Sequence, residues 1–104
     1  MSLKKKQIRQ NFRDAVFGRD GYKCVFCDIT ENLDAHHITD RNELPNGGYV
    51  KENGITLCHK HHEDAEIWHQ FNGELYEEGM TPADLYVKIG TTLEEAIEAS
   101  KRLK

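Results

Sequence analysis

Apolar residues recur at helical spacing near the N-terminal end of the chain, where Ile8, Phe12 and Val16 fall on one side of a helix. We therefore predict an amphipathic helix over residues 4–17. Basic and other polar side chains would occupy the rest of its surface. Gly18 is the expected end of this helix, because glycine readily adopts the left-handed conformation that closes helices.

The middle of the chain carries short apolar runs in place of helical periodicity. Residues 33–39 and 55–57 are strand candidates, and we expect 33–38 to pair with 55–57 as a hairpin. The segment between them, 40–54, contains Pro45 and a Gly-Gly pair and shows little periodicity. A loop of this length in so small a domain is usually functional or mobile.

A helix is predicted directly after the second strand, over residues 59–71. Ala65, Trp68 and Phe71 would form its apolar stripe, because they recur at helical spacing. A glycine follows the last of these residues and is a suitable end for the helix.

The C-terminal part of the chain predicts two more helices, each opened by a threonine that can cap it. Thr81 is followed by proline, which suits the first helical position, and the helix is expected over 83–89. Thr92 has a glutamate three residues later, the spacing of a capping box, and its helix is expected to reach about residue 103. Leu93, Ala96 and Ile97 are expected to face the core, with Leu103 as a further candidate.

The composition favours a single small domain with a modest core. Of the 104 residues, 38% are hydrophobic and 31% are charged, so a purely apolar core would be marginal and a metal crosslink would compensate. The predicted fold class is α+β, with a hairpin and a helix at the centre, one N-terminal helix and two C-terminal helices. We divide the domain into a basic N-terminal helix, a core and a C-terminal helical part, at residues 1–23, 24–72 and 73–104. No apolar run is long enough to span a membrane, so a cytoplasmic protein without a membrane partner is expected.

Two short motifs, C-x-x-C and C-x-x-H, lie about thirty residues apart and predict a structural zinc site. Three cysteines fit poorly with a disulfide framework, whereas three thiolates and one imidazole complete a tetrahedral zinc shell. The expected ligands are Cys24, Cys27, Cys58 and His61. His59 and His62 crowd the same turn, and His61 is preferred because it keeps the two-residue spacing. The main alternative is a redox dithiol, which would be expected in a βαβ context.

A second group of polar residues surrounds the predicted hairpin. His36 and His37 are neighbours on a strand, so their side chains should leave it on opposite faces. One of them could then bind a metal while the other addresses a substrate. His62 falls in the first turn of the following helix, and Asn53 ends the long loop. Several of the six histidines could instead be exposed polar residues, but a cluster of imidazoles favours metal or proton chemistry.

The charge is distributed unevenly, which matters more than the net charge of −4. Residues 1–23 carry seven Lys or Arg against two Asp, whereas residues 63–104 carry four Lys or Arg against ten Asp or Glu. The basic N-terminal segment and the acidic C-terminal segment would orient the protein so that its N-terminal segment faces a polyanion. The residues expected to contact nucleic acid are Lys4, Lys5, Lys6 and Arg9. A solvated basic tail is an equally simple explanation of their charge.

The order of these motifs resembles the HNH endonucleases, in particular the zinc-containing type found in restriction enzymes and phage nicking enzymes. The chain reads C-x-x-C, then L-D-A-H-H-I, a Gly-Gly loop, N-G-I-T-L-C, and finally H-H. The resemblance covers about residues 19–68 and implies a ββα-metal fold, two strands and a helix around a divalent ion. One departure is that a histidine, His61, stands where relatives usually have a fourth cysteine.

The resemblance also implies a role for each residue of the second group. His36 and His62 would bind the catalytic metal ion, and His37 would be the general base. Asn53 would orient the loop or a histidine ring, and a contact of Asn53 with the metal stays open. Glu66 occupies a position where some relatives carry another histidine, and it is a further candidate ligand, directly or through water.

The resulting functional prediction is a metal-dependent DNA endonuclease that nicks its substrate with little sequence specificity of its own. Zn²⁺ would be structural, and Mg²⁺ or Mn²⁺ catalytic, although imidazole ligands also suit Co²⁺ or Ni²⁺. The expected partner is DNA, and a homodimer or a larger phage or restriction assembly stays open. The main alternative is a non-catalytic, zinc-stabilised module that binds DNA or protein.

Overall fold

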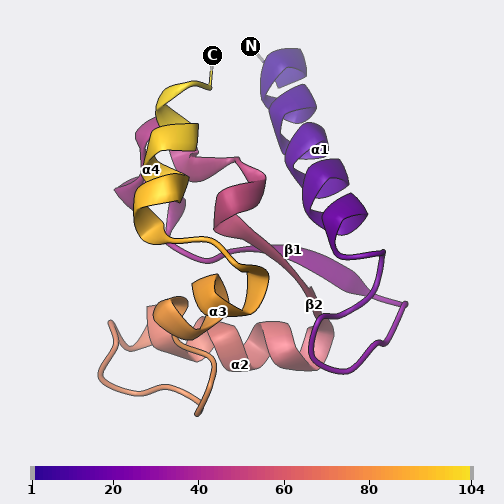
Figure 1. Cartoon of the computed structure of the whole chain (residues 1–104), viewed down its shortest axis with the longest axis vertical. Coiled ribbons are helices and arrows are strands. Elements are labelled where there is room, and N and C mark those ends of the chain that lie inside the picture. The colour runs from indigo at the N-terminus through magenta and orange to yellow at the C-terminus, as the bar shows by residue number, and fades with distance from the viewer. Residues whose placement is uncertain (1, 104) are drawn as a thin grey trace.

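The computed structural model describes residues 2–103, which form an α+β domain of four helices and one two-stranded antiparallel sheet (Figure 1). The predicted fold class is therefore confirmed at this level. The hairpin lies at the centre in Figure 1, with α1 on one side of it. The elements in chain order are α1 (Ser2–Arg19), β1 (Leu33–His37), β2 (Gly54–Cys58), α2 (His59–Gln70), α3 (Pro82–Ile89) and α4 (Leu93–Lys101). Within the described residues, no helix is both long and apolar enough to cross a membrane.

Helix α1 continues through Gly18, so the prediction that this glycine ends the helix is wrong. The end is set by Gly21, whose φ of 73° is left-handed. Two backbone hydrogen bonds close the turn: the N–H of Tyr22 donates to the carbonyl of Phe17 at 2.9 Å, and that of Gly21 donates to Gly18 at 3.4 Å. This is a Schellman arrangement, which requires a left-handed residue two positions beyond the last helical one.

Close packing and hydrogen bonding hold helix α1 against strand β2. Phe12 and Val16 are buried and lie against Gly54, where an added Cβ would come within 2.8 Å of the Phe12 ring. Asp20 accepts a hydrogen bond from the backbone N–H of Thr56 at 3.0 Å. Only glycine allows this close approach of helix and strand, so the sequence at position 54 fixes where α1 lies.

The hairpin has the expected pairing, but its strands end at different residues from those predicted. In the antiparallel register, His36 pairs with Ile55 and His37 pairs with Gly54. Strand β1 ends at His37, and one further bond follows in the same register, from the backbone N–H of Ile38 to the Asn53 carbonyl at 2.9 Å. The next residue, Thr39, bonds the side chain of Asn53 in place of a backbone partner, and there the chain turns away from the ladder.

The segment between the strands is a compact loop with three short 3₁₀ turns, η1 (Arg41–Glu43), η2 (Pro45–Gly48) and η3 (Lys51–Asn53). The side chain of Asp40 caps η1 by accepting from the N–H of Asn42 at 3.1 Å. The local turns are too short to give the periodicity by which helices are recognised in a sequence.

The two C-terminal helices begin as predicted, with complete capping boxes at Thr81 and Thr92. Helix α3 ends at Gly90, whose φ is 77°. Two predicted core positions are wrong: Leu93 is 40% exposed, and Phe71 lies just beyond α2 and is 49% exposed. The core lies between the hairpin, its loop and α2, α3 and α4. Its largest fully buried side chains are Ile38, Ile55, Leu57 and Leu85.

Candidate functional site

Three cysteines and one histidine converge at the junction of β2 and α2, as the two ligand motifs predict. The Sγ atoms of Cys27 and Cys58 are 3.6 Å apart. The Nδ1 atom of His61 lies 3.2 Å from the Cys58 sulfur and 3.7 Å from that of Cys24. Tetrahedral zinc, with bonds of about 2.0–2.3 Å, separates its ligand atoms by about 3.3–3.8 Å. The four side chains are therefore compatible with a zinc site.

Local backbone geometry brings these ligands together. Cys24 and Cys27 lie on a tight turn, in which the N–H of Asp28 donates to the Cys24 carbonyl at 2.9 Å. Cys58 is the last residue of β2, and His61 lies in the first turn of α2. The turn and the strand therefore place one ligand pair each. A redox dithiol would need only the first pair, so the convergence of all four side chains favours a metal site.

The thiols of this cluster are electrostatically uneven. Burial opposes ionisation of Cys24, but backbone N–H groups around its sulfur outweigh burial and lower its pKa. Burial likewise opposes ionisation of Cys58, whereas hydrogen bonds from His61 lower its pKa. A backbone hydrogen bond from Ile29 lowers the pKa of Cys27, but burial and the neighbouring Cys24 and Cys58 thiols outweigh it and raise that pKa. Zinc binds the thiolate, so the lowered pKa values of Cys24 and Cys58 favour the form that a metal needs.

A second cluster joins β1 to α2 and consists of His36, His62 and Glu66. One carboxylate oxygen of Glu66 lies 3.4 Å from Nδ1 of His36 and 3.2 Å from Nε2 of His62. The imidazole of His36 is almost completely buried, whereas the other two side chains are partly exposed. Two imidazoles and a carboxylate form a donor set that suits a divalent transition metal such as Mn²⁺.

Asp34 supports this second cluster and was missed by the sequence analysis. Its carboxylate lies 3.0 Å from Nδ1 of His62, which leaves Nε2 of that ring directed at Glu66. When one nitrogen of an imidazole binds a metal, a carboxylate at the other nitrogen fixes the orientation and the tautomer of the ring. The signal was present in the sequence, because residues two apart on a strand share a face and Asp34 precedes His36 by two.

Glu66 and His36 shift each other's protonation equilibria. The hydrogen bond with His36 and the nearby imidazoles lower the pKa of Glu66 to about 2, although burial opposes the shift. Burial lowers the pKa of His36 despite the carboxylate beside it. At neutral pH the pair is therefore an ionised carboxylate and an uncharged imidazole, and both have lone pairs available.

His37 leaves β1 on the face opposite to His36, in keeping with the alternation of side chains along a strand. Its ring stacks on Phe12 of α1 with a centroid distance of 4.5 Å. The edge of Tyr49 packs against the same imidazole at 4.7 Å. Burial, followed by the charges of His36 and Arg41, lowers the pKa of His37 to about 4. The ring is therefore unprotonated at neutral pH, as a general base must be.

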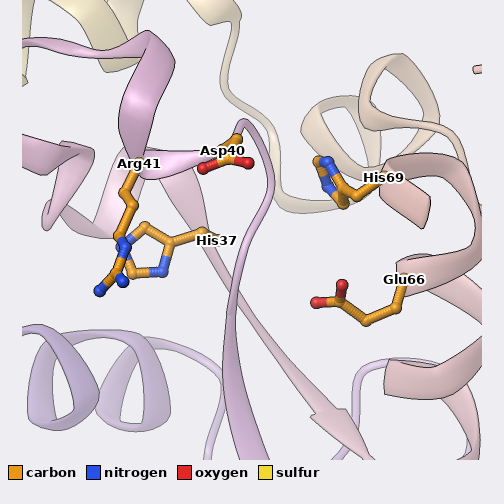
Figure 2. Close-up of a pocket in the computed structure, with 5 residues that line it drawn as sticks. All are labelled: His37, Asp40, Arg41, Glu66 and His69. Carbon is orange, nitrogen blue, oxygen red and sulfur yellow. The ribbon is translucent and has the colours of Figure 1, made fainter. Parts of the chain in front are cut away.

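A cleft of about 240 Å³ runs around the end of β1 and connects the two faces of the hairpin. Figure 2 shows His37 and Arg41 on one side of this space, with Glu66 and His69 of α2 on the other. Asp40 completes the lining. The general-base candidate and one member of the His36–His62–Glu66 cluster thus border the same cavity. A substrate in the cleft would meet both.

Asn53 lies behind the cleft and holds the loop to the end of β1. It is completely buried, and its amide oxygen accepts from the Thr39 N–H at 2.9 Å and from the Tyr86 hydroxyl at 2.8 Å. Its amide nitrogen donates to the carbonyls of Thr39 and Gly48 at 3.1 and 3.3 Å. These four bonds engage both polar atoms of the Asn53 side chain and hold the loop to the end of β1 and to α3. Sequence reasoning missed Tyr86, whose contact with Asn53 spans 33 positions in the chain.

The remaining histidines and the basic residues of α1 lie in different surroundings. His59 is exposed and pairs with Glu63, as an ordinary surface histidine would. His69 is not such a residue, since it lines the cleft with its ring 5.7 Å from that of His36. Lys4, Lys5, Lys6 and Arg9 are exposed on α1.

Comparisons with protein-family models, with curated proteins and with solved structures found no match for this chain. Function is therefore inferred from the geometry of the two side-chain clusters and from the cleft that joins them to His37. The Cys24–Cys27–Cys58–His61 cluster is compatible with a structural zinc site, because its four candidate ligands come from two knuckles and two of them, Cys24 and Cys58, are buried. The His36–His62–Glu66 cluster borders open space and is the candidate reactive centre.

Proposed function

We propose that this chain is a metal-dependent endonuclease of the HNH type, which hydrolyses phosphodiester bonds of DNA. The observation that carries the proposal is the joint arrangement of the His36–His62–Glu66 cluster and His37 around one cleft. The order of β1, β2 and α2, with a potential metal ligand on the first strand and two on the helix, supports a ββα-metal core.

The metal-binding cluster and the base divide the chemistry between them. A divalent ion held by His36, His62 and Glu66 would stabilise negative charge that develops on the phosphate. His37 would accept a proton from the attacking water, since its imidazole is uncharged at neutral pH. The guanidinium of Arg41 lines the cleft and would attract the phosphate by its charge. Hydrolysis would leave a 5′-phosphate and a 3′-hydroxyl.

Zinc would act on the structure of this site and take no part in the reaction. His62 directly follows His61, so a zinc-bound His61 would fix the first turn of α2 and with it the position of His62. Asp34 would fix the ring of His62 from the other side. The two clusters are thus mechanically coupled through adjacent residues.

The donor set and the single candidate reactive centre among the described residues suggest further properties of the proposed enzyme. Mg²⁺ or Mn²⁺ would serve as the catalytic ion, and the two imidazoles would also accept Co²⁺ or Ni²⁺. One active site per chain would favour nicking of one strand, with double-strand cleavage only where two copies meet. The described residues include no separate recognition domain, which favours weak sequence specificity.

The proposal is tested by single substitutions combined with a plasmid-nicking assay and calorimetric titration of Mg²⁺ or Mn²⁺. We expect His37→Ala to keep the ion bound while cleavage falls by about two to four orders of magnitude, the usual contribution of a general base. His36→Ala and His62→Ala should weaken metal binding, and excess metal should partly restore cleavage. None of these variants should release zinc.

A matched control is His59→Ala, which removes an exposed imidazole from the same helix and should cut like the parent. If His37→Ala loses the metal and His36→Ala keeps it, the two assigned roles are exchanged. If all variants cut like the parent, or the parent does not cut with any divalent ion, the nuclease proposal is wrong.

A non-catalytic, zinc-stabilised module that binds DNA or protein is the second candidate. The Cys24–Cys27–Cys58–His61 cluster and the exposed lysines of α1 favour it, since neither feature requires catalysis. Salt-dependent DNA binding without cleavage under any divalent ion would support this function over the first.

A further inference from the structure

A second cavity, of about 410 Å³, lies between α1 and the loop that follows β1. Basic and amide side chains form most of its lining, together with one aliphatic and one aromatic residue. The lining residues are Lys5, Ile8, Arg9, Arg41, Asn42, Asn46 and Tyr49. We call this space the α1 groove. Its side chains supply positive charge and hydrogen-bond donors on a concave surface.

The positive charge of the α1 groove is not neutralised from within. Lys5, Arg9 and Arg41 all line it, and no carboxylate does. Among the described residues, the ion pairs of the protein involve other cations, such as Arg19 with Asp20 at 2.7 Å. Uncompensated cations on a concave surface concentrate the positive potential and favour an anionic ligand.

Arg41 is held in a defined position at the edge of this groove. Its guanidinium donates a hydrogen bond to the Tyr49 hydroxyl at 3.1 Å. The Tyr49 ring is itself fixed, since it packs edge-on against Phe12 at 5.7 Å and against His37 at 4.7 Å. Arg41 is therefore supported by the same aromatic cluster that surrounds the general-base candidate.

The α1 groove meets the cleft at Arg41. This residue lines both cavities, with His37 and Glu66 in the cleft and with Lys5 and Arg9 in the groove. An extended polyanion that places one phosphate beside His37 would pass Arg41 on its way into the groove. The two spaces therefore adjoin at one guanidinium group.

Negative charge elsewhere on the protein also favours binding of DNA at the α1 groove. A cavity of about 450 Å³ beside α4 has four glutamates in its lining: Glu52, Glu94, Glu95 and Glu98. This cavity would repel a nucleic-acid backbone, whereas the α1 groove would attract it. The electrostatic difference would direct DNA towards the groove and the adjoining cleft.

We propose that the α1 groove is a phosphate subsite, in which Arg41, Arg9 and Lys5 hold the backbone phosphate adjacent to the bond that is cut. The inference rests on the proposed nuclease function and adds the path of the substrate strand. Arg41 and Tyr49 become positioning residues for DNA. Of the four basic residues expected to bind nucleic acid, Lys5 and Arg9 would contribute more than Lys4 and Lys6, which do not line the groove.

The test measures the affinity of a fluorescent DNA duplex over a range of salt concentrations, without added divalent ions, so that the DNA is not cut. We expect Arg9→Gln and Arg41→Gln each to weaken binding by about tenfold, the effect of losing a charged hydrogen bond. Each should also reduce the slope of log affinity against log salt by about 0.9, the value for one phosphate contact. Tyr49→Phe, which keeps the ring and removes the hydroxyl, should weaken binding less than Arg41→Gln.

The matched control is Arg13→Gln, because Arg13 lies on the same helix, over the ring of Phe17, and outside the groove. Arg13→Gln changes the net charge by the same amount as the other two variants. We expect its slope of log affinity against log salt to stay close to that of the parent. If Arg9→Gln and Arg41→Gln bind DNA as Arg13→Gln does while the parent still cuts plasmid, the phosphate subsite is refuted and the nuclease function stands. If the parent neither binds nor cuts DNA, the nuclease function fails and this inference fails with it.

Discussion

Outside the two candidate metal clusters, Asn53 is predicted to be the polar residue whose replacement lowers the stability of the domain most. Replacing it by alanine removes four hydrogen bonds at once, two accepted by the amide oxygen and two donated by the amide nitrogen. The residue is completely buried, so water cannot replace these bonds without opening the loop. Asn53→Ala should therefore loosen the attachment of the loop to β1 and to α3.

The expected loss of stability follows from the number of bonds. A buried hydrogen bond contributes about 0.5–1.5 kcal/mol net, so four give a loss of about 2–6 kcal/mol in the free energy of unfolding. A domain of this size has a total stability of about 5–15 kcal/mol, so the variant should remain folded only marginally. The Tyr86 hydroxyl keeps a contact with Thr39 Oγ1 at 2.7 Å, which places the loss below the upper end of this range.

The measurement is equilibrium unfolding in urea with zinc present, followed by the fluorescence of Trp68, the single tryptophan. A loss of about 3 kcal/mol should move the midpoint by about 1–3 M. Asn42→Ala is the control in the same loop, because Asn42 is exposed and its replacement should change stability by less than about 0.5 kcal/mol.

A second substitution, Asn53→Asp, separates the hydrogen bonds from the shape of the side chain. The new carboxylate would still accept from Thr39 and Tyr86, but it would face the carbonyls of Thr39 and Gly48 without a proton to donate. Its pKa in the folded state should be raised, so its proton is bound more tightly there than in the unfolded chain. The variant should therefore regain stability relative to the parent as the pH falls from 7 towards 4. A loss below about 1 kcal/mol for Asn53→Ala would refute the reasoning.

Three further predictions concern the zinc site, the helix–strand contact and pH. Cys58→Ser should release zinc and unfold or severely destabilise the domain, while the parent carries about one zinc per chain by elemental analysis. Gly54→Ala should lower the free energy of unfolding by about 1–3 kcal/mol, because the new methyl group meets the Phe12 ring, and urea unfolding tests this. The free energy of unfolding of the parent should fall as the pH falls from about 6.5 to 4, because over this range His37 takes up a proton in the unfolded chain but not in the folded protein. His37→Phe removes this group, so its melting temperature should fall less over the same pH range.

The helices of the C-terminal part could be predicted because their boundaries are fixed by local contacts. The capping boxes at Thr81 and Thr92 each join residues three apart, and Gly90 adopts the left-handed conformation that ends α3. Gly18 shows the limit of such reasoning. Glycine permits a helix to end but does not require it, and the end of α1 is set instead by Gly21.

Which face of a helix is buried depends on tertiary contacts, and the spacing of apolar residues along the sequence does not reveal these contacts. Leu93 and Ala96 are both apolar and lie near each other on α4, yet Leu93 is 40% exposed while Ala96 is fully buried. The larger residue has the stronger hydrophobic signal, but helix α4 packs against the loop between the strands, and the residues that it buries are small. Ala99 and Ser100, which are also small, are buried on the same helix.

The candidate metal ligands were predictable to the extent that they come in short pairs. Cys58 and His61 are three residues apart, and His62 and Glu66 lie one turn apart on α2, so local spacing places them. Arg41 and Tyr49 could not be found in this way. Their importance comes from a hydrogen bond inside the loop and from packing of that loop on α1, and both depend on how the loop folds.

The alternation of side chains along β1 poses a problem for a nuclease, because His36 and His37 lie on opposite faces of the hairpin. Two groups on opposite faces of an uninterrupted sheet cannot act on one phosphate. Here the strand ends at His37, and the loop turns away where Asn53 captures the backbone of Thr39. The cleft occupies the space beyond this end, where His37 and Glu66 both reach it. In the proposed nuclease, the buried amide of Asn53 would therefore serve catalysis indirectly, by holding the backbone of Thr39 away from the ladder just beyond the residue where the two faces must meet.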